Sequence, residues 1–147
     1  MGPQSVESRC ERQLDLVVRA GERQNMDWTV LAAIATVESK WTPSARNRSG
    51  ASGLMQIMPS TGRRLKCGDL LDPVDNVNCG ARLMRRLLDR YDDRLPYALA
   101  AYAAGARSVD RAYKAQARPP KERFVARVLS LSRAFAERGC AAVDEKR

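Results

Sequence analysis

A single carboxylate follows an apolar stretch of this chain. Residues 30–37 are mostly alanine and branched aliphatic side chains, and Glu38 comes directly after them. Desolvation disfavours a charged carboxylate, so burial beside this stretch should raise the pKa of Glu38. A general acid that works near neutral pH requires such a raised pKa. Glu38 is therefore a candidate for acid–base chemistry, although a glutamate at a helix end is more commonly a solvated charge.

Later segments could line a cleft beside this carboxyl. Gly50 and Gly53 allow a ligand to approach the backbone closely. The amide of Gln56 suits hydroxyl and acetamido groups, and Met55 offers a soft apolar surface. Small residues around Tyr102 would let its phenol reach into such a cleft. Each of these residues, taken singly, could equally belong to the core.

Helical periodicity predicts the elements that must position these side chains. A loop or short hairpin is expected near residues 42–59, where glycine, proline, serine and asparagine are frequent. The remainder predicts a mainly α fold, with one domain over residues 4–147. Helices are expected over residues 6–22, over 28–38 with Asp27 as N-cap, and over 97–104. A short helix should be capped by Ser60 and end at residue 65, and a longer one should run from 75 or 76 to 91. A further helical piece should end at about 115, and the last helix should run from 119 or 120 to 138.

The cysteine content favours disulfides over metal binding. The chain has four cysteines and no histidine, so a zinc site is not expected, and we predict no cofactor. Among three connectivities we favour Cys67–Cys79, which bracket a short loop, and Cys10–Cys140, which lie near the two ends. Disulfides would place the protein in an oxidising compartment such as the bacterial periplasm. The alternative is four buried thiols in a cytosolic protein.

The bulk properties limit the functional classes. The 147 residues carry a formal net charge of +9 and 44% hydrophobic residues, which fits one folded, basic domain. No apolar run is long enough to span a membrane. The start Met1-Gly2-Pro3 is typical of a cloning remnant, so we expect an exported protein whose signal peptide has been removed.

Three short motifs follow one another in a characteristic order. They are Glu38-Ser39, residues 50–59 with Gly-Leu-Met-Gln at their centre, and residues 100–105 around Tyr102. In this order and spacing the chain resembles the soluble lytic transglycosylase family, a lysozyme-like helical domain related to goose-type lysozyme. The resemblance covers roughly residues 26–128.

The resemblance implies a role for individual residues. Glu38 matches the catalytic glutamate, and the matched substrate-binding positions are Asn47, Met55, Gln56, Tyr102 and Ala103. Two positions depart from the family pattern. Ala103 stands where the family usually has asparagine, and Phe124 stands where it has tyrosine. Both departures remove a polar group and predict weaker activity or an altered substrate preference.

The acidic residues indicate a mechanism with one carboxylate. Most glycosidases use two carboxylates, but no Asp or Glu occurs between Ser39 and Gly68. The family cleaves the β-1,4 bond between N-acetylmuramic acid and N-acetylglucosamine in peptidoglycan and leaves a 1,6-anhydro end. We therefore expect Glu38 to act first as acid and then as base.

Three alternatives remain open, together with the biological setting. A hydrolytic lysozyme of the same fold would need a second carboxylate, for example from residues 69–75, and a peptidoglycan-binding protein would have impaired activity. A nucleic-acid binder is disfavoured because no known binding motif is present. We expect a monomer that acts on glycan strands, with components of secretion systems or pili as candidate partners.

Overall fold

The structure is a computed structural model that describes residues 4–144. The predicted remnant Met1–Pro3 lies outside these residues. Helices dominate the described part of the chain, which confirms the predicted mainly α fold. They are α1 (Val6–Arg23), α2 (Trp28–Ser39), α3 (Pro59–Arg64), α4 (Pro73–Arg90), α5 (Leu95–Ala104), α6 (Ala106–Lys114), α7 (Glu122–Arg138) and the 3-10 helix η1 (Gly139–Val143).

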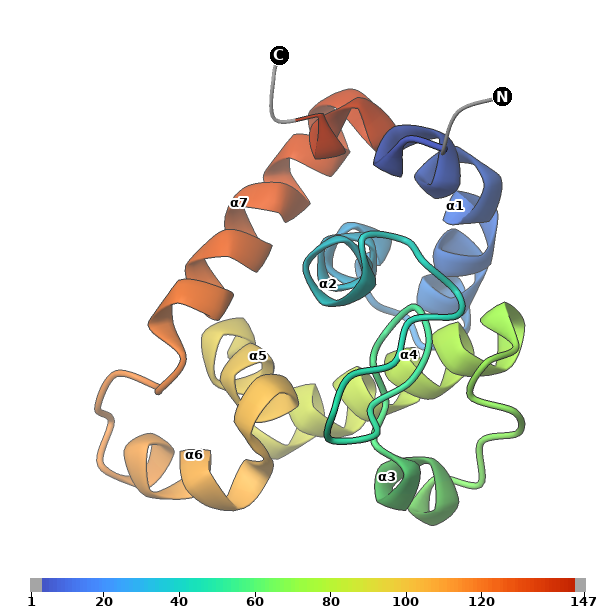
Figure 1. Ribbon diagram of the computed structural model, residues 1–147. Coiled ribbons are helices and arrows are strands. Elements are labelled where there is room, and N and C mark those ends of the chain that lie inside the picture. Colours follow the sequence, from blue (N-terminus) through green and yellow to red (C-terminus); the bar gives the residue numbers. More distant parts are fainter. Residues whose placement is uncertain (1–3, 145–147) are drawn as a thin grey trace.

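Helix α2 lies at the centre of the molecule, surrounded by α1, α4, α5 and α7 (Figure 1). Its apolar residues from Val30 to Ala35 are almost completely buried, as the sequence predicts. Asp27 caps the helix: its Oδ1 accepts from the backbone N–H of Thr29 at 2.9 Å and from the Thr29 hydroxyl at 2.7 Å. The core is therefore built around the helix that carries Glu38.

Helix α7 covers one side of α2 and contacts it along much of its length. Phe135 on α7 packs between Trp28, the first residue of α2, and Trp41, just beyond its end, with ring centroids 6.4 Å and 6.2 Å away respectively. These aromatic contacts fix α7 at both ends of the central helix.

Both predicted disulfides are present. Cys10 on α1 pairs with Cys140 in η1, with a Cα–Cα distance of 5.8 Å. Cys67 pairs with Cys79 on α4, with a Cα–Cα distance of 5.6 Å. The first bond joins the two ends of the described chain, which lie side by side (Figure 1).

Several predicted helix boundaries are wrong, mainly at prolines. Helix α3 has Met58 as its N-cap and Pro59 at its first position, so Ser60 lies inside the helix. Helix α4 likewise starts at Pro73, because proline is well suited to the first turn of a helix. Helix α7 starts only at Glu122, after Lys121 in a left-handed conformation (φ 62°). Helix η1 was not predicted.

The segment between α2 and α3 forms a loop whose second half is buried. Its antiparallel contacts are the isolated bridges Arg46–Ser52 and Ser52–Ile57, and no strand forms in this loop. Residues 51–55 and 57 are buried in spite of the irregular backbone. Among residues 4–144, no helix is long and apolar enough to cross a bilayer.

Candidate active site

Two left-handed residues end α2 just beyond Glu38. Lys40 has φ 49° and Trp41 has φ 62°, and their backbone N–H groups donate to the carbonyls of Thr36 and Ala35. The Trp41 side chain is fully buried, and its indole N–H donates to the Thr36 hydroxyl at 2.9 Å. The direction of the chain after Glu38 is therefore fixed by the core.

Two side chains of α1 hold this helix end from outside. The guanidinium of Arg9 donates to the carbonyl of Lys40 at 3.0 and 3.2 Å, and the Gln13 amide donates to the carbonyl of Trp41 at 3.0 Å. These bonds satisfy carbonyls that a helix end leaves without intrahelical partners. Arg9 and Gln13 were not predicted as site residues, and their spacing of one helical turn is the only local signal for them.

Glu38 itself is half-buried, and burial raises the pKa of its carboxyl above the usual 4.5. No described residue in the range 4–144 forms a hydrogen bond or an ion pair with this carboxyl. Desolvation without a compensating donor favours the neutral acid. Glu38 thus has the electrostatic character of a proton donor, as the sequence predicts.

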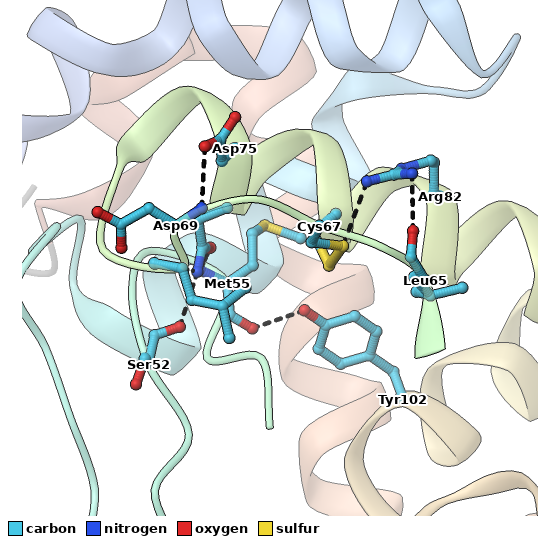
Figure 2. The surroundings of a disulfide bond; sticks show 11 residues. Ser52, Met55, Leu65, Cys67, Asp69, Asp75, Arg82 and Tyr102 are labelled. Carbon is cyan, nitrogen blue, oxygen red and sulfur yellow. Dashed lines mark hydrogen bonds between the residues drawn. A yellow bond between two sulfur atoms is a disulfide. The ribbon is translucent and has the colours of Figure 1, made fainter. Parts of the chain in front are cut away.

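Tyr102 connects α5 to the loop and to the carboxyl. Its hydroxyl donates to the backbone carbonyl of Met55 at 2.6 Å (Figure 2). Burial raises the pKa of this phenol well above 10.0, and the negative charge of Glu38 raises it further. The two side chains therefore lie close enough to interact electrostatically, and Tyr102 remains protonated.

The predicted substrate contact of Met55 is not supported by the structure. Met55 is fully buried, so its side chain offers no surface to a ligand. It packs on Gly80 of α4, where an added Cβ would lie 2.7 to 3.0 Å from Met55 side-chain atoms. Met55 is instead a core residue whose backbone carbonyl receives the Tyr102 hydroxyl.

Gln56 follows in a left-handed conformation, with φ 51°. Its amide nitrogen donates to the carbonyls of Ala45 at 3.1 Å and Gly53 at 2.9 Å, which braces the loop internally. The side-chain carbonyl oxygen accepts no hydrogen bond from residues 4–144. Half-buried Gln56 can thus offer that oxygen to a ligand while its nitrogen supports the loop.

The other two predicted binding residues are exposed. Asn47 closes a turn of the same loop, with its Oδ1 accepting from the N–H of Ala51 at 3.0 Å. Ala103 lies next to Tyr102 near the end of α5. Neither forms a hydrogen bond with Glu38.

Two of the acidic residues after the loop, Asp69 and Asp75, have structural partners. Asp75 accepts a hydrogen bond from the backbone N–H of Asp69 at 3.0 Å, and Asp69 accepts one from that of Leu71 at 2.9 Å. Figure 2 shows the carboxylates of Asp69 and Asp75 on the opposite side of Met55 from Tyr102. They close the segment between α3 and α4. No group of three or more potential metal ligands occurs among residues 4–144.

A cavity of about 630 Å³ lies at another face of the α2 end. Glu38 is not among its lining residues. Thr36 and Lys40 line it from α2, and residues two positions away on a helix point in nearly the opposite direction. The cavity is thus separate from the candidate active site.

A central buried helix that ends in a half-buried carboxyl, beside a tyrosine-braced loop, defines a lysozyme-like domain. The chain matches the family model of the transglycosylase SLT domain over residues 15–125 and belongs to this family. This membership confirms the resemblance to soluble lytic transglycosylases.

Individual relatives give the same result. The membrane-bound lytic murein transglycosylase F of Alcanivorax borkumensis is 39% identical over 97 residues, which are 62% of this chain and 21% of that protein. The transglycosylase of Enterobacteria phage PRD1 is 36% identical over 69% of this chain and 38% of that protein. The chain thus spans only part of the relatives it matches.

The fold agrees with a solved structure. The 70 kDa soluble lytic transglycosylase from Escherichia coli superimposes with a TM-score of 0.71 at 27% identity, over 87% of this chain and 25% of that one.

Proposed function

We propose that residues 4–147 form one domain that cleaves peptidoglycan as a lytic transglycosylase. The observation that carries this proposal is the carboxyl of Glu38. It is half-buried at the end of the central helix, its pKa is raised, and Tyr102 lies within electrostatic range. The names of the relatives, which are lytic murein transglycosylases, support the same substrate class.

The reaction uses Glu38 twice. Neutral Glu38 first donates its proton to the oxygen that links N-acetylmuramic acid to N-acetylglucosamine, and the bond from that oxygen to the anomeric carbon breaks. The acetamido group of the muramic residue stabilises the positive charge at this carbon. The 6-hydroxyl of the same sugar then attacks it and returns its proton to Glu38, which leaves a 1,6-anhydro end. Intramolecular attack is favoured by proximity over attack by free water.

The arrangement of carboxylates supports one acid over two. No Asp or Glu lies between Ser39 and Gly68, and of the next three acids along the chain, Asp69, Asp72 and Asp75, the first and the last accept hydrogen bonds from the backbone. A hydrolytic lysozyme would need one of them to activate a water molecule.

Muropeptide analysis tests this function. Wild-type protein should release anhydro-muropeptides from purified sacculi, and Glu38→Gln should release none while keeping its fold. Glu137→Gln is the matched control, because Glu137 is an exposed glutamate near the end of α7. Reducing ends would instead identify a hydrolase. Binding to sacculi without released product would identify a binding protein, and turnover by Glu38→Gln would exclude Glu38 as the acid.

We further propose the periplasm as the compartment and an anionic wall as the partner of the basic surface. Disulfides persist in oxidising compartments, and a net charge of +9 attracts stem-peptide carboxylates. Arg107, Arg111 and Lys114 form an exposed face of α6. Adsorption to sacculi should weaken as salt is raised, and adsorption that is independent of salt would contradict this proposal.

We also propose components of a secretion system or pilus as partner proteins, with the chain acting as a monomer. Sedimentation tests the monomeric state directly. Co-purification with such an assembly from cells tests the partner, and a stable dimer or the absence of any such association would argue against it.

A further inference from the structure

Asn76 is a fully buried amide in the first turn of α4 that lies outside the motifs assigned above. Its side chain makes three hydrogen bonds, which use both N–H groups and the carbonyl oxygen. Its Oδ1 accepts from the N–H of Met55 at 2.7 Å, and its Nδ2 donates to the carbonyls of Ser52 at 2.7 Å and Leu70 at 2.8 Å. One side chain therefore joins α4 to the loop after α2 and to the segment after α3.

The backbone is shaped to admit this amide. Gly53 has φ +82°, and an added Cβ there would lie 2.1 Å from the Nδ2 of Asn76 and 2.4 Å from the carbonyl oxygen of Leu70. Any larger residue would therefore displace Asn76 from the loop. The glycine that opens the Gly-Leu-Met-Gln motif makes room for Asn76 rather than for a ligand.

Met55 links Asn76 to the candidate active site. Met55 is held at its N–H by Asn76 and at its carbonyl by the hydroxyl of Tyr102. Figure 2 shows Met55 between Tyr102 of α5 and the segment joined to α4. Tyr102 in turn interacts electrostatically with Glu38.

We infer that Asn76 is a positioning residue for the pair of Glu38 and Tyr102, and that it acts through the backbone of Met55. This inference rests on the proposed function of Glu38. Asn76 touches neither side chain itself, and it fixes the carbonyl to which Tyr102 must bind. A shift of the loop would break the hydrogen bond that holds the Tyr102 hydroxyl.

The disulfide Cys67–Cys79 supports the same arrangement. Cys79 lies one turn along α4 from Asn76, and Cys67 lies just before the segment that supplies the Leu70 carbonyl. Arg82 adds hydrogen bonds from α4 to the carbonyl of Leu65 at 2.9 Å and to the Cys67 sulfur at 3.2 Å. Asn76 thus has a rigid support on one side and the active-site loop on the other.

A double-mutant cycle tests this inference. Asn76→Ala and Tyr102→Phe should each lower kcat on sacculi by on the order of 10- to 100-fold, because misplacement of reacting groups by about 1 Å has effects of this size. The double variant should lose little more than either single variant, since both interrupt one path. The inference would be overturned if the kcat losses of the two single variants multiplied in the double variant. A folded Asn76→Ala protein with wild-type kcat would overturn it as well.

Val77→Ala separates positioning from general destabilisation. Val77 is the adjacent core residue and is 1% exposed. This variant should lower Tm and leave kcat unchanged. Asn76→Asp keeps the acceptor toward Met55 but sets an oxygen against the carbonyls of Ser52 and Leu70, so it should lose kcat as Asn76→Ala does. If Asn76→Ala does not fold, Asn76→Ser replaces it in the cycle.

A pH titration of Glu38 does not depend on enzyme activity, so it distinguishes a failure of this inference from a failure of the proposed function. The carboxyl carbon of Glu38 can be followed by NMR against pH. Its pKa should fall toward the usual value in Asn76→Ala, because a displaced Tyr102 admits water, and stay raised in Val77→Ala. An unchanged titration in Asn76→Ala overturns the positioning role. A wild type that releases no muropeptides overturns only the function.

Discussion

The hydroxyl of Tyr102 and the carbonyl oxygen of Met55 lie 2.6 Å apart and join α5 to the loop that follows the catalytic candidate. The pKa of this phenol is raised well above 10.0, so it stays a hydrogen-bond donor at every pH at which the protein could function. Because Met55 is fully buried, its carbonyl cannot turn to water if the donor is lost. The bond therefore stabilises the fold as well as the site.

Tyr102→Phe should consequently lower the free energy of unfolding by about 1–3 kcal/mol, the usual effect of leaving a buried acceptor unsatisfied. Urea denaturation measures this loss. Tyr113→Phe is the control, since the Tyr113 hydroxyl donates to the exposed Asp92. Tyr113→Phe should lower the free energy of unfolding by less than Tyr102→Phe does, and it should leave muropeptide release unchanged. Equal losses in the two variants would show that the Met55 carbonyl finds another donor.

Replacing Glu38 should change the dependence of stability on pH. Its folded pKa is raised above 4.5 by burial, so the carboxyl is most favourable to folding below pH 4.5 and this contribution is lost as the pH rises through the folded pKa. Glu38→Gln carries no buried charge. The variant should have a higher Tm than wild type at pH 7, and the difference should vanish as the pH falls below 4.5.

Thermal unfolding of both proteins across this pH range measures the effect. Glu137→Gln should show no such pH-dependent difference in Tm from wild type, because Glu137 is exposed. A Glu38→Gln protein that is less stable than wild type at pH 7 would mean that the carboxylate has a stabilising partner in solution.

Ala103→Asn should raise activity. Ala103 is exposed beside Tyr102, where the related family usually has asparagine. One added hydrogen bond to substrate, about 0.5–1.5 kcal/mol, would raise kcat/KM by up to about tenfold. The lower helix propensity of asparagine should cost at most about 0.7 kcal/mol of stability. Ala136→Asn on α7 controls for that cost, and an unchanged kcat/KM would show that position 103 does not reach the substrate.

The two disulfides should differ in their effects on stability. Cys10–Cys140 links residues that are 130 positions apart in the sequence, and Cys67–Cys79 links residues that are 12 positions apart. Chain entropy alone predicts losses of about 5 and about 3 kcal/mol for the respective double serine variants. Denaturation under non-reducing conditions measures both. Only the second pair should also lower kcat, because it supports Asn76, and a reversed order of stability would contradict the entropic explanation.

Three helices were predictable because their signals are local. Helices α1, α2 and α5 agree with the sequence within two residues, since apolar periodicity and caps such as Asp27 lie within the helix itself. Proline was ambiguous, because it can occupy the first turn of a helix or precede the helix. It occupies the first turn of α4, whereas α7 begins only after the Pro119-Pro120 pair.

The candidate site was predictable only in part. Glu38 is marked by the apolar run before it. Met55 was misassigned because its burial depends on Gly80, a glycine of another element. Asn76 was predicted only at the start of a helix, and its bonding role was missed because its partners Met55 and Ser52 are 21 and 24 residues away, and no local pattern encodes such contacts.

The bond between Cys10 and Cys140 makes nearly the whole domain a covalent ring. A protease that cuts one peptide bond anywhere between these cysteines releases no fragment, because the two pieces stay joined through sulfur. The two pieces can refold together around α2, because the disulfide keeps them in one molecule. Loss of the domain then requires a second cut or a reductant, so the disulfide makes the protein more resistant to proteolysis.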